Sequence, residues 1–351
     1  MDENNSLSTP IQTIIIPTWN QKRMLLEAID SCLKQSQKSI EVIVFDDGST
    51  DGTDELMKTV TDERVHYFRS EKNVGGGRRF GLDRARGKYI TFLDHDDYYT
   101  DYDFFAKAVK ILDEHENDEV PIAFLGASSV LLNEISRKSI VCDVGNSGRV
   151  RGLDFLIDPY KYPKPNSVFP TVFRADILRK IDFDKYSMGD IFLYMLSALY
   201  GDVWYLPDVI GVWRRHGANE LSGVKNNPEY DKRIPAAKIK GTRTWLFIRD
   251  NLYKHYSKLK VDLWFAERMA MIFWGQALHH KGLSGLKKRL KYEADIFKAA
   301  GFMPAFWVMF PLRRIYAIVR GSLSEITPLR AVYRFFKYRL RGKPYPDFPG
   351  Y

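Results

Sequence analysis

Short apolar runs alternate with amphipathic segments over the first part of the chain. In residues 21–35 the apolar positions recur with the spacing of one helix face: Met24, Leu25, Ala28, Ile29, Cys32 and Leu33. The short apolar runs between such segments are rich in β-branched residues, which is typical of buried strands. The pattern predicts strands at 11–16, 40–45, 65–68 and 89–93 and helices at 21–35 and 77–86.

Strand–helix repetition at this spacing predicts an α/β fold with a mostly parallel central sheet, right-handed crossovers and flanking helices. In such sheets ligands bind beyond the carboxyl ends of the strands. The residues that follow the predicted strands are Thr18, Asp46, Asp47 and the run 94–97. These residues are therefore the first candidates for a binding site.

The rest of the chain changes its pattern twice. Residues 120–225 are irregular, with strand-like pieces at 122–125, 168–173 and 203–205. From about residue 226 the pattern is helical, with segments at 235–256, 260–280 and 285–299. We therefore expect four parts: a flexible N-terminus at 1–10, an α/β domain at 11–225, a helical extension at 226–300 and a C-terminal segment at 301–351.

The composition narrows the class of protein. Of the 351 residues, 45% are hydrophobic and 28% are charged, which is ordinary for a globular protein and excludes a mostly disordered chain. The two cysteines, Cys32 and Cys142, are too few for a disulfide framework or a four-cysteine zinc site. Residues 1–5 are polar and acidic and do not resemble a secretory signal, so we expect the cytoplasm.

Charge is distributed unevenly along the chain. Residues 226–351 contain 25 Lys and Arg against 9 Asp and Glu, whereas residues 1–225 contain 28 against 35. An asymmetry of this size indicates that the basic part meets phosphates, on a membrane or on a nucleic acid. Solvated helix faces are the alternative interpretation.

The end of the chain is both basic and aromatic. Residues 301–351 hold nine Lys and Arg, two acidic residues and twelve aromatic residues. An apolar stripe runs beside a basic stripe: Leu329, Val332, Phe336 and Leu340 beside Arg330, Arg334, Lys337 and Arg341. This pattern predicts a basic amphipathic helix on an anionic membrane surface, and hence a peripheral protein on the inner face of the plasma membrane. A helix packed on the domain, with its basic face in water, is the alternative.

Three carboxylates in four residues form the strongest chemical signal. Asp94, Asp96 and Asp97 follow a predicted buried strand, and His95 lies among them. Carboxylates this close repel one another unless a cation lies between them. Their oxygens suit Mn²⁺ or Mg²⁺, with the phosphates of a substrate completing the coordination. An acidic helix N-cap is the alternative.

Two further polar stretches follow other predicted elements. Asp46 and Asp47 offer carboxylates to a ribose or to a base N–H, or they cap the next helix. Residues 73–79 read Asn-Val-Gly-Gly-Gly-Arg-Arg, a turn whose amides and arginines suit a pyrophosphate, and a flexible loop explains it equally well. This turn matches neither a dinucleotide-binding Gly-x-Gly-x-x-Gly nor a P-loop, which disfavours nicotinamide dehydrogenases and P-loop enzymes.

The order and spacing of these stretches resemble family 2 glycosyltransferases of the GT-A fold. The resemblance covers residues 11–103 and rests on Ile-Pro-Thr-Trp-Asn at 16–20, Val-Phe-Asp-Asp-Gly-Ser-Thr-Asp at 44–51, Asn-Val-Gly at 73–75, Gly-Lys-Tyr-Ile at 87–90 and Phe-Leu-Asp-His-Asp-Asp at 92–97. It implies that 11–103 is the nucleotide-sugar half of the domain. Residues 104–225 are similar to the acceptor half, in the stretches 172–178, 189–190, 205–208 and 213–216.

The resemblance also implies roles for individual residues. The donor nucleotide sugar is expected to contact Pro17, Thr18, Asp46, Asp47, Asn73, Gly75, Arg78, Asp94 and His95. A divalent cation, Mn²⁺ or Mg²⁺, is expected at Asp96 and His216. Asp190 is expected to act as the general base. Many relatives have Glu-Asp where this chain has Gly189-Asp190, so the base falls to Asp190 alone.

The implied reaction is inverting transfer of a sugar from a UDP-sugar to a hydroxyl of a glycan or lipid-linked acceptor, in cell-surface polysaccharide synthesis. Two alternatives use the same features. A sugar-phosphate nucleotidyltransferase also needs paired aspartates and a metal, and a non-catalytic nucleic-acid binder would use the basic half of the chain. We expect no nucleic acid as a partner, because such a binder leaves the acidic loops of the first half unexplained.

Overall fold

The computed structural model describes residues 9–145, 147–158, 161–165, 167–217 and 228–277. The chain divides into two compact units, Met1–Asn251 and Leu252–Tyr351. All residues predicted for the site fall in the first unit. The helix expected at 285–299 and the basic segment expected at 301–351 lie outside the described residues.

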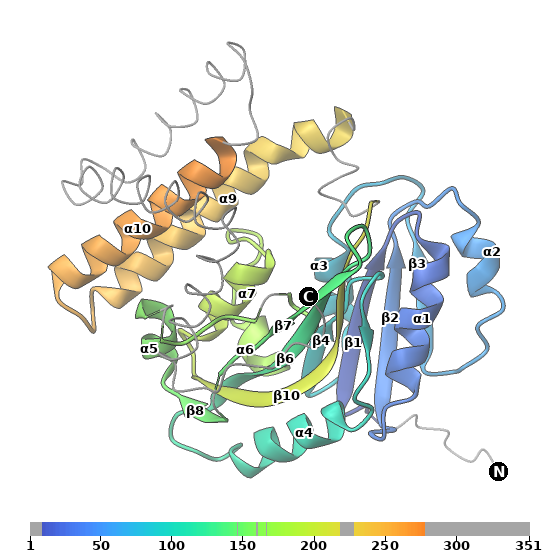
Figure 1. The fold of residues 1–351 in the computed structure, drawn as a ribbon, viewed down its shortest axis with the longest axis horizontal. Coiled ribbons are helices and arrows are strands. Elements are labelled where there is room, and N and C mark those ends of the chain that lie inside the picture. Colours follow the sequence, from blue (N-terminus) through green and yellow to red (C-terminus); the bar gives the residue numbers. More distant parts are fainter. Residues whose placement is uncertain (1–8, 146, 159–160, 166, 218–227, 278–351) are drawn as a thin grey trace, which may run out of the picture. The chain divides into compact units, whose positions relative to one another are not determined.

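A mixed sheet forms the centre of the first unit (Figure 1). Its strands are β1 (Gln12–Thr18), β2 (Ile40–Asp46), β3 (Val65–Arg69), β4 (Tyr89–Phe92), β5 (Tyr98–Tyr99), β6 (Ile122–Asn133), β7 (Lys138–Cys142), β8 (Gly148–Val150), β9 (Thr171–Arg174) and β10 (Asp202–Arg215). Their order is β3-β2-β1-β4-β9-β6-β10-β5, with β7 paired to β6 and β8 paired to β10. Strands β3, β2, β1 and β4 are parallel, as are β6 and β10, whereas β9 is antiparallel to both of its neighbours.

Helices connect these strands: α1 (Lys22–Leu33), α2 (Thr53–Met57), α3 (Gly77–Arg84), α4 (Phe104–Glu114), α5 (Gly152–Ile157), α6 (Ala175–Arg179) and α7 (Asp190–Ser197). They are followed by α9 (Pro228–Leu252) and α10 (Lys258–Ala277). The predicted α/β fold with a central sheet and flanking helices is confirmed, although the sheet is mixed. Among the described helices, none has both the length and the hydropathy that a membrane span requires.

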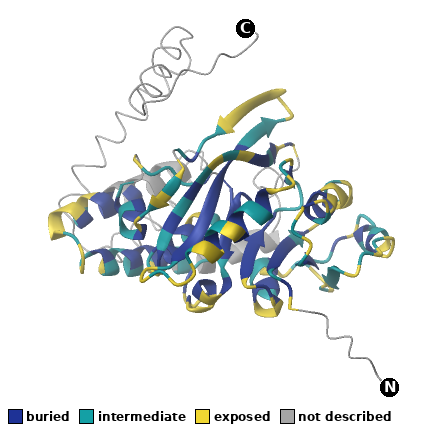
Figure 2. Ribbon diagram, turned by 90° about the horizontal axis from the view of Figure 1, so that it is seen from below, coloured by how far each residue is buried: buried dark blue, intermediate teal, exposed yellow. Residues whose placement is uncertain are grey.

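The core follows from the alternation of side chains along the strands. Ile14 and Ile16 of β1 point to one face of the sheet, where they join a buried cluster with α1 and α4. Ile15 points to the other face, toward α3. The predicted apolar stripe of α1 is buried, at Leu25, Ala28, Ile29 and Cys32. Buried residues run along the central strands in Figure 2, whereas β7 is mostly exposed.

The largest differences from the predicted strand bounds occur in three strands. The pieces expected at 122–125 and 203–205 are parts of the long strands β6 and β10, which pair with each other over most of their lengths. Buried polar residues, such as Ser128, interrupt the apolar pattern of β6 without ending the strand. The strand expected at 168–173 begins only at Thr171, because Pro170 has no N–H to donate to a neighbouring strand.

The part of α9 that lies in the first unit supports the segment before α7. The Thr244 hydroxyl oxygen accepts a hydrogen bond from the Ser187 amide at 3.0 Å, and the rings of Phe247 and Tyr186 stack with centroids 4.6 Å apart. The Lys240 ammonium donates to the carbonyl of Phe183 at 3.2 Å. Residues 183–189, which lead to Asp190, are therefore held by tertiary contacts.

Candidate functional site

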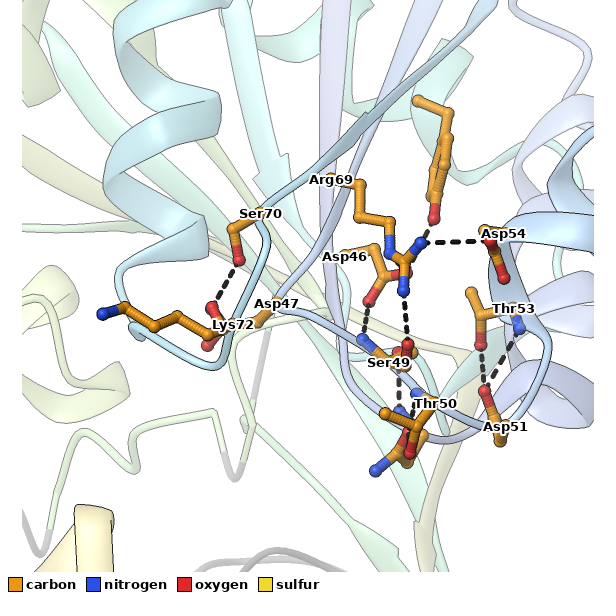
Figure 3. A network of polar contacts seen from close by, with 12 residues as sticks. Asp46, Asp47, Ser49, Thr50, Asp51, Thr53, Asp54, Arg69, Ser70 and Lys72 are labelled. Atoms are coloured by element: carbon orange, nitrogen blue, oxygen red, sulfur yellow. Dashed lines mark hydrogen bonds and ion pairs between the residues drawn. The ribbon is translucent and has the colours of Figure 1, made fainter.

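The loop after β2 is organised around the buried carboxylate of Asp46 (Figure 3). One carboxylate oxygen accepts from the Ser49 amide at 2.8 Å, and the other accepts from the Tyr67 hydroxyl at 2.6 Å. Burial and the neighbouring Asp46 charge raise the pKa of Tyr67 above its usual value, so this hydroxyl stays protonated and remains a donor. Arg69, on the same face of β3, donates to the Ser49 carbonyl at 2.8 Å. Asp46 is therefore a structural centre of this loop.

Asp47 fastens the glycine-rich loop to the tip of β2. Its two carboxylate oxygens accept hydrogen bonds from the amides of Val74 and Gly75, each at 2.7 Å. Its own amide donates to the carbonyl of Thr18 at the tip of β1, at 2.9 Å. The loop needs glycine because Gly75 and Gly76 have φ angles of 70° and 90°. Asp47 thus holds a loop and does not cap α2, whose N-cap residue is Gly52; Asp51 accepts from the Thr53 amide at 3.2 Å.

Helix α3 packs closely against β1 at two glycines. A Cβ on Gly81 would lie 2.3 Å from a methyl carbon of Ile15, and a Cβ on Gly77 would lie 2.9 Å from Pro17. The helix therefore lies directly against β1 and begins beside its carboxyl end. This packing brings Arg78, in the first turn of α3, to the acidic residues that follow β4.

The Arg78 guanidinium bridges two carboxylates that are far apart in the sequence. Its Nη2 donates to Oδ1 of Asp94 at 3.0 Å, and its Nη1 donates to Oδ1 of Asp190 at 2.5 Å. Burial opposes the charged form of Arg78, but Asp94 and Asp190 outweigh this and raise its pKa above the usual value. Asp190 is the first residue of α7, where the helix dipole favours a negative charge. The Arg78 guanidinium therefore links the residues that follow β4 to the start of α7.

The remaining acidic residues after β4 have separate partners. The Asp96 carboxylate lies 3.1 Å from Nε2 of His216, which follows β10. Asp97 is buried and accepts from the Arg214 amide at 3.0 Å, and burial together with Asp96 and Asp94 raises its pKa well above the usual value. The alternative of an acidic helix cap does not hold for 94–97, because the next helix begins only at Phe104.

Asp96 and His216 form the pair of side chains that could share a divalent cation. A carboxylate oxygen and an imidazole nitrogen 3.1 Å apart are close enough to be two ligands of one ion. Within the described part of the chain, no group of three or more His, Cys, Asp or Glu side chains forms a complete metal site. This donor set fits Mn²⁺ or Mg²⁺, because such ions are commonly held by one or two carboxylates together with substrate phosphates.

The structure brings the predicted residues together at one edge of the sheet. The carbonyl oxygen of Pro17 lies 3.2 Å from Nδ1 of His95, and this contact ties β1 to the acidic run. Thr18 ends β1, Asp47 follows β2, and Gly75 lies in the loop before α3, where its amide donates to Asp47. Asn73 lies in the same loop as Gly75, and its backbone nitrogen is 3.0 Å from the position of a Cβ on Gly48.

Sequence reasoning missed the residues of β3 that support this edge. Tyr67 and Arg69 both contact the loop after β2. Their spacing of two residues on a strand places them on one face of the sheet, and this is the signal that could have found them. Nothing in the local sequence indicates that the face meets Asp46.

Comparison with solved structures defines the class of this fold. The crystal structure of S. aureus TarS 1–349 in complex with UDP-GlcNAc superposes with a TM-score of 0.61 at 20% sequence identity, covering 83% of this chain and 81% of the TarS chain. The complex of TarS 1–349 with UDP gives a TM-score of 0.58 at 19% identity, covering 82% and 80%. The fold is that of GT-A glycosyltransferases.

Residues 13–158 match the family model described as Glycosyl transferase family 2. An uncharacterized glycosyltransferase of Haemophilus influenzae is 43% identical over 96 residues, which are 26% of this chain and 38% of that protein. The GalNAc(5)-diNAcBac-PP-undecaprenol beta-1,3-glucosyltransferase of Campylobacter jejuni is 26% identical over 228 residues, covering 62% of this chain and 69% of that protein. The chain spans only 35% to 38% of the length of three of the curated relatives it matches.

Proposed function

We propose that the protein is an inverting glycosyltransferase that moves a sugar from a nucleotide-diphosphate donor to a hydroxyl group of a glycan or lipid-linked acceptor. One observation carries this proposal beyond the family match: a single guanidinium, that of Arg78, contacts both Asp94 after β4 and Asp190 at the start of α7. Asp94, expected on the donor side, and Asp190, which could serve as the base, are therefore close enough to contact the same guanidinium.

The residues have complementary tasks in this reaction. The acceptor oxygen attacks the anomeric carbon of the sugar, the bond from that carbon to the donor phosphate breaks, and Asp190 takes the proton of the attacking hydroxyl. Negative charge grows on the leaving diphosphate, and cationic groups beside it favour that charge. A single displacement inverts the anomeric centre. A divalent cation held by Asp96 and His216 would supply further charge stabilisation.

The loops at the tips of β1 and β2 would receive the nucleotide. Thr18, Asp47, Asn73 and Gly75 line this edge, beside the buried Asp46 centre. We propose a UDP-sugar as donor, and the TarS complexes with UDP and UDP-GlcNAc are consistent with this fold accepting such a ligand. A lipid-linked acceptor is consistent with the undecaprenol-linked substrate in the name of the Campylobacter jejuni relative.

Replacement of Asp190 tests the assignment of the base. Asp190→Asn should lower the rate of sugar transfer by about 100- to 10,000-fold while leaving UDP binding nearly intact, because the amide cannot accept the proton. Transfer is followed by release of nucleotide diphosphate from a panel of nucleotide sugars with Mn²⁺, and UDP binding by calorimetry. Asp184→Asn is the matched control, since Asp184 precedes the same helix but is 85% exposed at the side chain. Full activity of Asp190→Asn would refute the assignment, and pyrophosphate release from UTP and a sugar phosphate would identify a nucleotidyltransferase instead.

We also propose that residues 301–351 hold the enzyme on an anionic membrane surface, where a lipid-linked acceptor would be found. The support is the sequence pattern of a basic stripe beside an apolar stripe. A variant that ends at residue 300 should lose its binding to vesicles containing anionic lipid. Unchanged binding of this variant would remove the membrane assignment and leave the proposed reaction untouched.

A further inference from the structure

Arg78 has a contact that donor binding does not require. A residue that only neutralised a diphosphate would need to face the donor, yet the Arg78 guanidinium contacts Asp190, the proposed base, at 2.5 Å. The same guanidinium also lies 3.4 Å from the carbonyl oxygen of Met188, two residues before that base. Arg78 therefore holds the segment that carries Asp190 as well as its carboxylate.

We propose that Arg78 is a positioning residue for the general base: it fixes the Asp190 carboxylate and ties it to Asp94 on the donor side. This inference rests on the proposed function, in which Asp190 accepts the acceptor proton. The planar guanidinium can donate to two carboxylates at once in a fixed geometry, which a lysine ammonium on a flexible stem cannot reproduce. The shape of the Arg78 side chain is thus as important as its charge.

Both α3, which carries Arg78, and the segment before Asp190 are held by tertiary contacts, as this role requires. Gly77 and Gly81 bring α3 into direct contact with β1, and Asp47 binds the loop that precedes the helix. The side chain of Arg78 is only 18% exposed. On the opposite side, the segment before Asp190 is held by α9 through the bond from the Ser187 amide to Thr244. The guanidinium therefore spans two supported elements.

The next residue provides a matched comparison. Arg79 carries the same charge, but it contacts Asp83 within α3 and the exposed Asp184 at 3.3 Å. Its side chain is 39% exposed. Changes at Arg79 therefore alter the charge of α3 in the same way as changes at Arg78, without touching the carboxylates of the site.

The test compares Arg78→Lys, Arg78→Gln and Arg79→Gln in the full chain. We expect both Arg78 variants to lower kcat for transfer, by about 100-fold for Arg78→Gln and at least about tenfold for Arg78→Lys, because a base displaced by about 1 Å costs on the order of 100-fold in rate. The dissociation constant of UDP should change by less than about threefold. Arg79→Gln should keep both quantities within about twofold of the unsubstituted protein. Thermal unfolding identifies any variant that fails to fold, and Arg78→Lys is the milder substitution for that case.

Two outcomes would overturn the proposal. If Arg78→Lys keeps full kcat, the charge alone suffices and the bridging geometry does not matter. If UDP binding weakens as much as kcat falls, Arg78 acts on the donor and not through the base.

A double variant gives an independent answer. In an Asp190→Asn background, Arg78→Gln should add little to the loss, because a residue that acts through Asp190 has nothing left to position. A further loss as large as in the unsubstituted protein would contradict the inference. Full activity of Asp190→Asn alone would instead refute the proposed base, so the two failures are distinguishable.

Discussion

The contact between Asp47 and the glycine-rich loop can be tested directly at the two amides involved. Replacing Asp47 with alanine removes both acceptors, at 2.7 Å from the nitrogens of Val74 and Gly75. Hydrogen bonds to a charged group contribute about 1.5–3 kcal/mol each, and the partial exposure of these two favours the low end or less. We take about 2 kcal/mol for the pair, which corresponds to roughly a 30-fold change in the local opening equilibrium.

Hydrogen–deuterium exchange measures this opening. In Asp47→Ala, peptides covering residues 73–77 should exchange roughly 30-fold faster, because exchange of a protected amide follows its local opening free energy. Since this loop leads into α3, we also expect weaker binding of UDP, measured by calorimetry. The strands β1 and β2 should keep their protection.

Asp51→Ala is the matched control for this experiment. The Asp51 carboxylate accepts from the amides of Thr53 and Lys22, so its loss should accelerate exchange there and leave residues 73–77 unchanged. The reasoning fails if the glycine-rich loop exchanges at the same rate with and without the Asp47 carboxylate. It also fails if both variants accelerate the same amides.

Three further outcomes follow from single contacts. Tyr67→Phe removes a 2.6 Å hydrogen bond to a buried carboxylate and should lower stability by about 1.5–3 kcal/mol in thermal unfolding, whereas Tyr102→Phe, at an exposed ring, should have little effect. Gly81→Ala places a Cβ 2.3 Å from a β1 side chain and should destabilise by more than about 1 kcal/mol in urea unfolding, while Gly217→Ala, whose Cβ would meet no atom of the described residues within 4 Å, should be nearly neutral. Asp96→Asn should abolish any gain in UDP affinity on adding Mn²⁺, measured by calorimetry with and without EDTA, and an undiminished gain would exclude Asp96 as a ligand.

The predicted elements and the observed ones agree where hydrophobic periodicity was strong. Helix α1 is amphipathic, and β1 and β2 each contain a continuous apolar run, at 14–17 and 42–45, so local pattern and tertiary burial select the same structure. The lengths of β6 and β10 could not be read in this way. Their buried polar residues, such as Ser128 and Ser129, look like strand ends in the sequence and become strand interior only because the two strands pair.

The sequence by itself determined which residues stand at the strand ends, because parallel strands present their carboxyl ends at one edge of the sheet. Only the tertiary structure decided their partners. Arg78 meets a carboxylate 112 positions away, and Asp96 meets a histidine 120 positions away. Such pairs depend on where α3, α7 and β10 are placed by packing, and no local pattern encodes that placement. The sequence therefore identifies the charged residues of this site, but the packing of the folded chain determines which of them form ion pairs.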